Sequence, residues 1–404
     1  MKTLLMTLFL AFAASAATAR AAESTPGQDN GDFTIQWRQM TRSAEQVEPS
    51  FTAGDVEVAV RPLPKAKPKD APKAALFIGD KLQSKTLIHP GKWYHFALVG
   101  SGGKVRLFVN GYPDGSEPVA MTLPAEIKAS AGVEQVTRST GAMGDRLVLS
   151  KFKQHLPADS NAKIVGHRGV HKHAPENTRI SYVQAVEAGA PIVEFDTALT
   201  KDGHIIGMHD KTVDRTTDGH GAVAELTLEQ MKKLDAGSWK NAKYKGEPVP
   251  TIDDVADAVR GKAILMLDLK AEGQGEAIAK WLASSRFPHD QLILAPWEDA
   301  EGVALRKHVT DVPMIRLTTP VPTKTIDDAY FAKMKSIGFS GFSVNFGNLT
   351  AAFVDAAKRN GMAVYAWTIN DNPEIAGAML LGVDGIITDD AAVTAKTVAE
   401  LARK

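Results

Sequence analysis

Apolar and polar positions follow two different patterns along this chain, and the change comes near residue 155. From about residue 32 to residue 152, apolar residues recur at every second position in short runs. The clearest example is Trp93–Asn110, where Gly-Ser-Gly-Gly separates two alternating runs. This period of two is typical of β-strands joined as hairpins. No convincing helical period occurs before residue 150, so we expect an all-β sandwich over residues 23–155.

After a predicted linker at residues 156–162, strand-like runs alternate with helix-length segments. Thr178–Ala188, ended by Gly189, is one such segment, and Ala351–Asn360, ended by Gly361, is another. Repeated units of this kind predict a parallel sheet, and about eight of them predict a (β/α)8 barrel over residues 163–404. The expected strands are Ile164–His167, Ile192–Leu199, His204–His209, Ala263–Lys270, Gln291–Pro296, Met314–Leu317, Gly341–Asn345, Ala363–Ile369 and Gly385–Thr388.

One of these nine runs, His204–His209, does not fit a parallel barrel. Only Thr-Lys-Asp-Gly separates it from the preceding strand, and a parallel crossover needs roughly a dozen residues. We therefore expect an antiparallel return. An Asp-Gly two-residue turn would pair Lys201 with His204 and place Asp196 opposite His209. Directly opposed residues project to one face of the sheet, so the pattern predicts a carboxylate and an imidazole side by side.

Charged side chains gather where the predicted barrel strands end, which is where the active sites of this fold lie. Buried carboxylates that face each other cost free energy, and a hard divalent cation would relieve that cost. All-oxygen ligands favour Mg²⁺, Ca²⁺ or Mn²⁺. Basic side chains there suit an anionic substrate such as a phosphate, and histidines suit proton transfer. The residues concerned are His167, Arg168, Glu194, Asp196, His209, Asp268 and Lys270.

Each of these signals alone also fits a structural role, as a satisfied ion pair or a hydrogen-bonded histidine. Their convergence on one rim of the barrel favours a functional site.

Composition and charge narrow the picture. The chain has 404 residues, 47 basic and 47 acidic side chains and no cysteine. Balanced charge gives no reason to expect nucleic-acid binding, and disulfides are excluded. Lys2, the apolar run Leu4–Ala14 and small residues up to Ala19 or Ala21 predict a signal peptide at residues 1–21. That run is too short to span a bilayer, so we expect an exported, soluble protein, periplasmic or secreted, without a transmembrane segment.

Residues 163–404 resemble the glycerophosphodiester phosphodiesterase family in five motifs that occur in order. The motifs are Gly166–Thr178, Glu194–Thr217, Leu267–Lys270, Trp367–Asn370 and Gly382–Asp390. The resemblance implies a metal-dependent barrel that hydrolyses glycerophosphodiesters to glycerol phosphate and an alcohol. It leaves open whether a neighbouring substrate hydroxyl or a metal-activated water attacks phosphorus.

The same resemblance assigns roles to individual residues. His167 and His209 would be the acid–base pair. One divalent cation, Ca²⁺ or Mg²⁺ with Mn²⁺ as a further candidate, would be held by the three carboxylates, and Arg168 and Lys270 would hold the phosphate. The metal ligands implied are Glu194, Asp196 and Asp268.

The third metal ligand departs from the family pattern. Asp268-Leu269-Lys270 stands where the family has Glu-Ile-Lys, and aspartate reaches roughly 1.5 Å less far. A turn-rich insertion at residues 211–250 would cover the site. Three of its residues, His220, Trp239 and Lys240, are candidates for substrate contact, although exposed loop residues often only meet solvent.

Four further residues in the motifs have open roles. Asn177 either binds substrate or fixes the site by hydrogen bonds, with Thr178 a candidate cap for the next helix. Trp367 is either a lid over the glycerol moiety or a core residue. His171 and His173 have no third nitrogen or sulfur ligand near them in the sequence, which favours loop residues without a role over a metal site.

The first half resembles concanavalin-A-like or laminin-G-like domains, so that a lectin-like sandwich would precede the barrel. Phe33–Trp37, Gly91–Gly111 and Gly144–Phe152 carry this resemblance. It implies either a domain that binds a glycan or the cell surface, or a domain that serves only as a spacer or packing unit. Two rival functions stay open for the whole chain: a lysophospholipid or phosphoinositide phosphodiesterase, and a non-enzymatic glycan-binding protein with a degenerate barrel.

Overall fold

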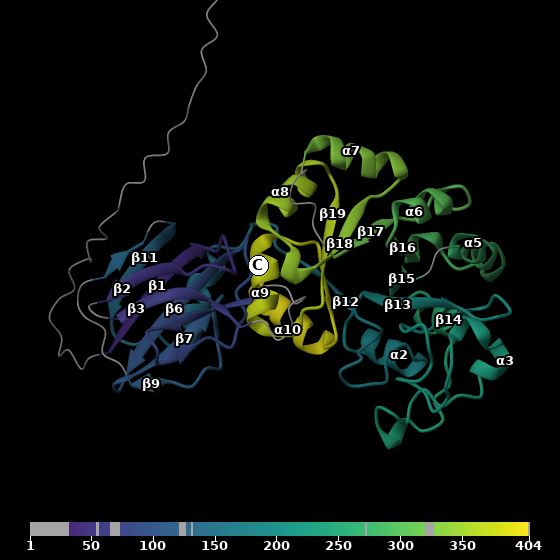
Figure 1. Ribbon diagram of the computed structural model, residues 1–404, viewed down its shortest axis with the longest axis horizontal. Coiled ribbons are helices and arrows are strands. Elements are labelled where there is room, and N and C mark those ends of the chain that lie inside the picture. Colours follow the sequence, from purple (N-terminus) through teal and green to yellow (C-terminus); the bar gives the residue numbers. More distant parts are fainter. Residues whose placement is uncertain are drawn as a thin grey trace, which may run out of the picture. The chain divides into compact units, whose positions relative to one another are not determined.

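The computed structural model describes residues 32–53, 56–64, 73–120, 127–130, 132–270, 273–319 and 327–402 (Figure 1). The predicted signal peptide at residues 1–21 lies outside these ranges. The chain divides into two compact units. The first holds most of the chain up to Val148, and the second holds Leu149–Lys404 together with His89–Trp93 and Asn110–Tyr112.

The first unit consists mainly of antiparallel strands in two sheets. The alternation of apolar residues along this part of the chain predicts such strands. In one sheet the order is β11-β1-β6-β7-β8, with β9 on β7, and in the other it is β10-β2-β3-β4-β5. The strands are β1 (Phe33–Met40), β2 (Glu48–Ala53), β3 (Val56–Leu63), β4 (Lys73–Ile78), β5 (Leu82–Gln83), β6 (Trp93–Ser101), β7 (Lys104–Val109), β8 (Tyr112–Pro113), β9 (Val119–Ala120), β10 (Lys128–Ala129) and β11 (Val133–Thr140).

Both sheets contribute to one hydrophobic core. Trp37 of β1 is stacked against Phe96 of β6, with ring centroids 5.2 Å apart, and meets Phe51 of β2 edge-on at 4.9 Å. All three side chains are fully buried. The likeness to concanavalin-A-like or laminin-G-like domains stays a prediction.

The expectation that no helix begins before residue 150 is wrong. Asp145–Lys153 forms helix α1, within a segment that the resemblance treats as part of the sandwich. An acidic residue in its first turn and two lysines in its last turn suit the helix dipole. Val148 and Phe152, four residues apart, are both fully buried. This single i, i+4 pair was too short a signal to register as a helical period.

The second unit contains the predicted barrel. Eight parallel strands run in the order β16-β15-β13-β12-β20-β19-β18-β17. Leu294 of β16 forms a parallel bridge with Met314, beside β17, and its N–H donates to the Pro313 carbonyl at 2.9 Å, so the two ends of the sheet meet. The strands are β12 (Lys163–Gly166), β13 (Ile192–Leu199), β15 (Ile264–Leu269), β16 (Leu292–Pro296), β17 (Ile315–Thr318), β18 (Gly341–Asn345), β19 (Ala363–Trp367) and β20 (Gly385–Thr388).

Helices follow these strands and cover the outside of the barrel (Figure 1). The Thr178 side chain caps the first of them by accepting a hydrogen bond from the Ser181 N–H, which confirms its predicted role. The helices are α2 (Arg179–Glu187), α4 (Ile252–Val259), α5 (Gln274–Ser285), α6 (Asp299–Arg306), α7 (Asp328–Ile337), α8 (Ala351–Arg359), α9 (Asn372–Leu381) and α10 (Ala391–Leu401), with the short turns η3 (His289–Gln291) and η4 (Phe346–Asn348) between them.

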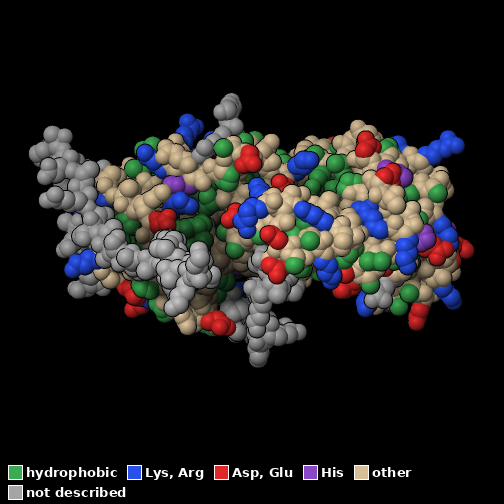
Figure 2. Space-filling model, turned by 90° about the horizontal axis from the view of Figure 1, so that it is seen from above, with side chains coloured by type: hydrophobic (Ala, Val, Ile, Leu, Met, Phe, Trp, Pro, Cys, Tyr) green, Lys and Arg blue, Asp and Glu red, His purple; other side chains and the backbone are tan. Residues whose placement is uncertain are grey.

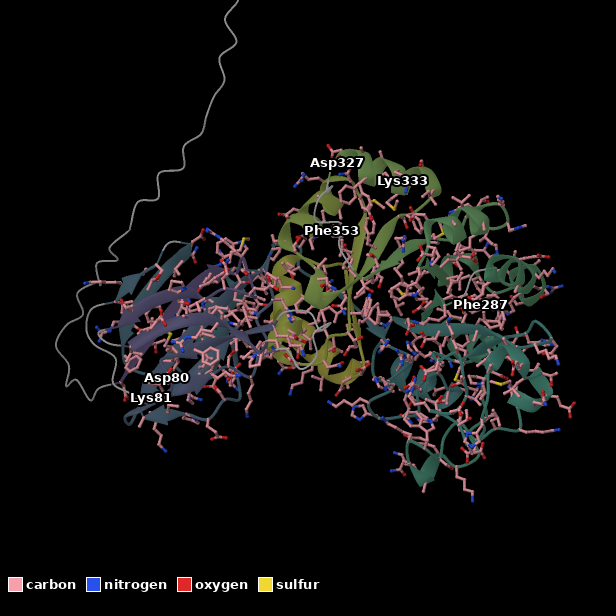
Figure 3. The ribbon with its side chains drawn as sticks, viewed as in Figure 1. Asp80, Lys81, Phe287, Asp327, Lys333 and Phe353 are labelled. Carbon is pink, nitrogen blue, oxygen red and sulfur yellow. The ribbon has the colours of Figure 1, made fainter. Side chains whose placement is uncertain are left out.

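Two layers of apolar side chains hold the barrel together. On β13, Ile192 belongs to the cluster inside the barrel, whereas Val193 and Phe195 belong to the cluster between strands and helices. In the outer layer, Phe353 of α8 is fully buried, while Lys333 of α7 keeps 63% of its side chain exposed (Figure 3). On the face shown in Figure 2, basic and acidic side chains are interspersed. None of the described helices could cross a membrane.

The predicted antiparallel return is confirmed, but its register is shifted by one residue. Strand β14 (Ile205–Gly207) pairs with β13 so that Thr197 faces Gly207 and Leu199 faces Ile205. The loop is therefore closed by Thr200 and His204, and Gly203 adopts a left-handed conformation with φ +81°. This is a three-residue loop rather than the expected two-residue turn.

As a result, Asp196 lies opposite Met208, whose N–H donates to the Asp196 carbonyl at 3.1 Å, and not opposite His209. The prediction that Asp196 and His209 are direct cross-strand partners is wrong. His209 lies just beyond the end of β14. The segment that follows contains η1 (Val223–Glu225), α3 (Leu228–Met231) and η2 (Ala242–Tyr244), around a small apolar cluster of its own.

Candidate active site

Three buried carboxylates face one another inside the barrel. The two-residue period of β13 places Glu194 and Asp196 on the same face as Ile192, and the parallel register sets Asp196 beside Asp268 of β15. Glu194 and Asp268 are each 5% exposed, and Asp196 is fully buried. Ligand oxygens from the three side chains all lie within 4.8 Å of one another, close enough to hold one metal ion. The structure thus brings together the predicted metal ligands.

The close packing of these carboxyl groups shifts their pKa values. Burial, followed by the charges of Asp196 and Asp268, raises the pKa of Glu194 well above its usual value. Burial and the charge of Asp196 raise the pKa of Asp268 to about 7. Burial acts on Asp196 in the same direction, but Lys270 and Arg168 outweigh it and hold the pKa of Asp196 below its usual value. The site has more negative charge than its own cations neutralise.

The two predicted phosphate-binding cations both contact these carboxylates. Lys270 Nζ lies 2.6 Å from Asp268 Oδ2 and 3.1 Å from Asp196 Oδ1. Arg168 Nε lies 3.1 Å from Asp196 Oδ2, and the Arg168 backbone N–H donates to Glu194 Oε2 at 2.9 Å. Arg168 has a left-handed backbone, with φ +52°. Both side chains also line the pocket described below, so they can meet a ligand as well.

Asn177 positions Asp196. Its Nδ2 donates to Asp196 Oδ2 at 2.8 Å, and its Oδ1 accepts from the Tyr182 hydroxyl at 2.7 Å and from the Asp196 N–H at 3.2 Å. The side chain is buried and is not among the pocket-lining residues. Of the two roles left open by the sequence, this geometry supports fixing the site by hydrogen bonds rather than contact with a substrate.

His167 follows β12 and is held by an aspartate that sequence reasoning gave no role. Its Nδ1 lies 2.6 Å from Asp389 Oδ1, at the end of β20. Asn370 Nδ2 donates to the other oxygen, Asp389 Oδ2, at 2.7 Å, and His171 Nε2 lies 3.0 Å from Asp389 Oδ1. Burial lowers the pKa of His167, and the hydrogen bond that the ring donates to Asp389 partly opposes that shift.

His209, like His167, has a carboxylate beside its Nδ1 atom. Its Nδ1 lies 2.7 Å from Asp210 Oδ1. Arg215 Nε donates to Asp210 Oδ2 at 2.6 Å, and the same guanidinium makes two hydrogen bonds to Glu176, of 2.8 and 2.9 Å. Glu176 also accepts from Arg168 at 2.8 Å. Arg215 therefore links the histidine after β14 to the loop that follows β12.

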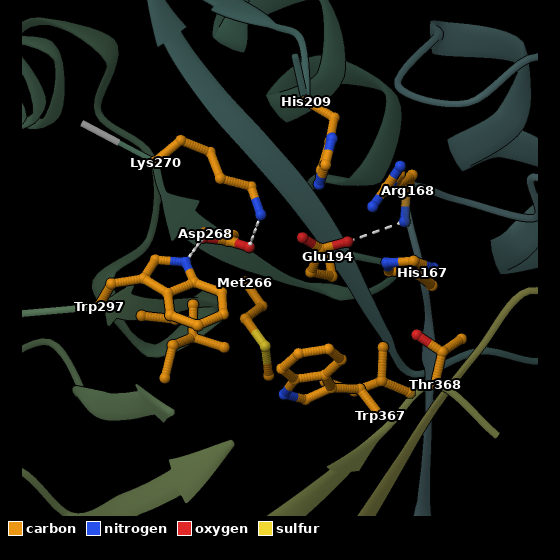
Figure 4. A pocket seen from close by; sticks show the side chains of 13 residues that line it. His167, Arg168, Glu194, His209, Met266, Asp268, Lys270, Trp297, Trp367 and Thr368 are labelled. Atoms are coloured by element: carbon orange, nitrogen blue, oxygen red, sulfur yellow. Dashed lines mark hydrogen bonds and ion pairs between the residues drawn. The ribbon is translucent and has the colours of Figure 1, made fainter. Parts of the chain in front are cut away.

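These side chains surround one pocket at the end of the barrel (Figure 4). Besides the charged groups, it has an aromatic wall: Trp297, directly after β16, and Trp367, at the end of β19, meet edge-on with ring centroids 6.0 Å apart. Trp297 Nε1 donates to Asp268 Oδ1 at 2.8 Å. The lining residues are His167, Arg168, Glu194, His209, Met266, Asp268, Lys270, Ala295, Trp297, Leu317, Trp367, Thr368 and Ile387.

The three candidates from the insertion are not among these lining residues. His220 is 87% exposed in its side chain and pairs with Asp214. Trp239 Nε1 donates to the Ala236 carbonyl, and Lys240 Nζ donates to the His171 carbonyl.

Other residues at the site were missed. Asp389 and Trp297 each come directly after a barrel strand, and this position at the C-terminal end of a strand is a signal that could have found them. No local pattern marks Arg215, because its partners Glu176 and Asp210 meet only in the folded chain.

Comparison with known proteins agrees with this geometry. Residues 167–393 match the glycerophosphoryl diester phosphodiesterase family. A glycerophosphodiester phosphodiesterase of Caldanaerobacter subterraneus subsp. tengcongensis is 32% identical over 234 residues, which cover 56% of this chain and 93% of the relative.

Two solved structures show the same fold. A phosphodiesterase of Oleispira antarctica, in complex with the product sn-glycerol-3-phosphate, has 27% identity and a TM-score of 0.55 over 61% of this chain and 98% of that one. A glycerophosphodiester phosphodiesterase of Agrobacterium tumefaciens has 23% identity and a TM-score of 0.51 over 58% of this chain and 99% of that one. The family match covers more than half of the chain and includes every group in the pocket that carries a charge. The chain therefore belongs to the glycerophosphoryl diester phosphodiesterase family.

Proposed function

We propose that this protein hydrolyses glycerophosphodiesters to glycerol phosphate and an alcohol. The observation that carries the proposal is the pocket, which two carboxylate-backed histidines, two basic side chains and the carboxylates of Glu194 and Asp268 line, with the carboxylate of Asp196 buried beside them. The named relatives and the product complex of the Oleispira antarctica enzyme support this substrate class.

Glu194, Asp196 and Asp268 would hold one divalent cation. The fit rests on the chemistry of the three side chains: all donors are carboxylate oxygens, and Asp196 Oδ1 is buried without a hydrogen bond, 3.1 Å from the Lys270 ammonium. Oxygen donors suit Ca²⁺, Mg²⁺ or Mn²⁺. Such a cation, when bound, would polarise a phosphoryl oxygen and neutralise developing negative charge.

His167 and His209 would exchange the protons of the reaction. Each ring has its Nδ1 against a carboxylate, so the other nitrogen, Nε2, is left for the substrate. An aspartate at Nδ1 fixes the ring orientation and the tautomer, and stabilises the imidazolium when a proton is taken up. One histidine would accept the proton of the attacking group, a substrate hydroxyl or a water, and the other would protonate the leaving oxygen.

The remaining lining residues would bind the substrate. Arg168 and Lys270 would meet the phosphate, because both already lie among the carboxylates at the pocket and carry a fixed positive charge. Trp297 and Trp367 offer apolar surface to the carbon skeleton of the glycerol. This favours a lid role for Trp367. Export by residues 1–21 and a glycan or cell-surface ligand for residues 23–155 stay predictions.

The test is an assay of the purified protein on glycerophosphocholine, a lysophospholipid and a phosphoinositide, each with Ca²⁺, Mg²⁺, Mn²⁺ or EDTA. We expect metal-dependent release of glycerol phosphate from glycerophosphocholine, and its loss in EDTA. Activity on the lysophospholipid or the phosphoinositide alone would favour the rival substrate class. No turnover of any substrate, with every metal, would refute the enzymatic function.

A further inference from the structure

A second group of side chains that could hold a metal ion lies beside the proposed carboxylate site and shares His167 with the proposed acid–base pair. It consists of His167, His171 and Asp389, whose ligand atoms all lie within 4.8 Å of one another. The parallel pairing of β12 with β20 creates it, because His167 and His171 follow one strand and Asp389 follows the other. None of the three is fully exposed: their side chains are 16, 29 and 17% accessible.

The donor atoms of this group differ from those of the carboxylate site. Two imidazole nitrogens and one carboxylate oxygen suit Zn²⁺, which binds such sets with one position left to water, rather than Mg²⁺ or Ca²⁺. Asp389 Oδ1 lies 2.6 Å from His167 Nδ1 and 3.0 Å from His171 Nε2. Ligand atoms of a tetrahedral zinc site are about 3.3 Å apart at ordinary bond lengths. The His167–Asp389 contact would need to lengthen by about 0.7 Å and the His171–Asp389 contact by about 0.3 Å.

The far side of His171 provides a second, independent observation. Its Nδ1 is buried and has no hydrogen-bond partner, and the carboxylate atom Glu176 Oε2 lies 3.9 Å away. A histidine that ligates a metal through one nitrogen usually donates the other N–H to a carboxylate. Coordination through Nε2 would place the proton on Nδ1, facing Glu176. The Glu176 carboxylate, 3.9 Å away, would then face an N–H group rather than a lone pair.

We propose that His167, His171 and Asp389 form a zinc site, and that zinc bound there inhibits the enzyme. In the neutral ring, His167 donates its Nδ1 proton to Asp389 and keeps a lone pair on Nε2, toward the pocket. Zinc at Nδ1 requires the other tautomer, so that proton moves to Nε2 and none is gained or lost. With Nε2 protonated and Nδ1 on the metal, His167 cannot accept a proton. The inhibition, though not the binding, rests on the proposed function.

Two matched variants of the same loop test the inhibition. His171→Gln keeps an N–H donor for Asp389 but removes the imidazole lone pair. His173→Gln is the control, because His173 is 55% exposed and contacts Asp390 instead. With glycerophosphocholine and saturating Mg²⁺, we expect Zn²⁺ to inhibit the wild type and His173→Gln alike. His171→Gln should need at least roughly tenfold more zinc for half inhibition, which is the usual scale for losing a ligand or its support.

A binding measurement separates this proposal from the enzymatic one. Co²⁺ added to the metal-free wild-type protein should give the intense visible absorption of a four-coordinate site with nitrogen ligands, with or without substrate turnover. The absorption should persist in His173→Gln and disappear in His171→Gln. Equal absorption in all three proteins, or equal zinc sensitivity of the wild type and His171→Gln, would overturn the proposal and leave His171 as a partner that only orients Asp389.

Discussion

Replacing Asp389 by asparagine tests whether this aspartate sets the protonation of His167. Three N–H donors converge on its carboxylate: His167 and His171 on Oδ1, and Asn370 on Oδ2. An asparagine has one oxygen and one NH₂ group in that place. Either the NH₂ faces the Asn370 donor, or it faces the histidines and forces His167 to accept at Nδ1. The second arrangement leaves the proton on Nε2, where the reaction needs a lone pair.

The size of the effect follows from the bond that is lost. A hydrogen bond to a charged group contributes about 2 kcal/mol, and a loss of that size in the transition state slows kcat about 30-fold. If the tautomer of His167 is also inverted, the loss can approach the roughly 10⁴-fold seen when the aspartate of a serine protease triad is changed in the same way. We therefore expect kcat of Asp389→Asn to fall at least about 30-fold, with KM little changed.

The assay is steady-state release of glycerol phosphate from glycerophosphocholine, with thermal unfolding to check that the variant is folded. Asp390→Asn is the matched control. Asp390 caps α10 by accepting from the Val393 N–H at 3.2 Å and pairs with Lys172, and asparagine caps a helix about as well. This variant should keep most of its activity. If a folded Asp389→Asn retains more than about a third of the wild-type kcat, Asp389 does not govern His167.

Three further outcomes follow from the structure. Because burial raises the pKa of Asp268 to about 7, protons compete with the cation below that pH. Lowering the pH from about 8 to about 6 should therefore weaken Mg²⁺ binding roughly tenfold. Titration calorimetry measures this affinity, and an affinity that does not change with pH would contradict the prediction. Arg215→Lys cannot make two hydrogen bonds to Glu176 and two to Asp210 at once, and should lower kcat/KM by about tenfold; an unchanged value would mean that this link is not needed. Phe353→Ala leaves a cavity at a fully buried position and should lower the free energy of unfolding by about 3–5 kcal/mol. Denaturant titration measures this change. A loss below about 1 kcal/mol would show that neighbouring side chains repack and fill the cavity.

Where the chain repeats a simple local rule, the sequence alone was sufficient. The boundaries of β13, β18 and β20 agree with the apolar runs Ile192–Leu199, Gly341–Asn345 and Gly385–Thr388, since a strand buried on both faces is a continuous apolar segment. The short connection after Leu199 was enough to predict an antiparallel return. The three carboxylates were found because a charge in such a segment is costly unless it has a partner.

The errors came where a local rule allows two outcomes. Asp202-Gly203 suits a two-residue turn and also a three-residue loop with glycine in the left-handed position, and the structure has the second. A difference of one residue moved His209 away from its expected place opposite Asp196. Helix α1 was missed because few of its apolar side chains are buried, chiefly Val148 and Phe152.

The sequence by itself determined which chemical groups are present and at which strand ends they lie. Only the tertiary structure decided which of them touch. Asp389 meets His167 across 222 positions of the chain, and Arg215 meets Glu176 across 39. Such partners are set by the closing of the barrel and by the path of the insertion, and no local pattern of residues encodes them. The same closure brings His171 to Asp389, whose carboxylate lies 3.0 Å from the histidine ring.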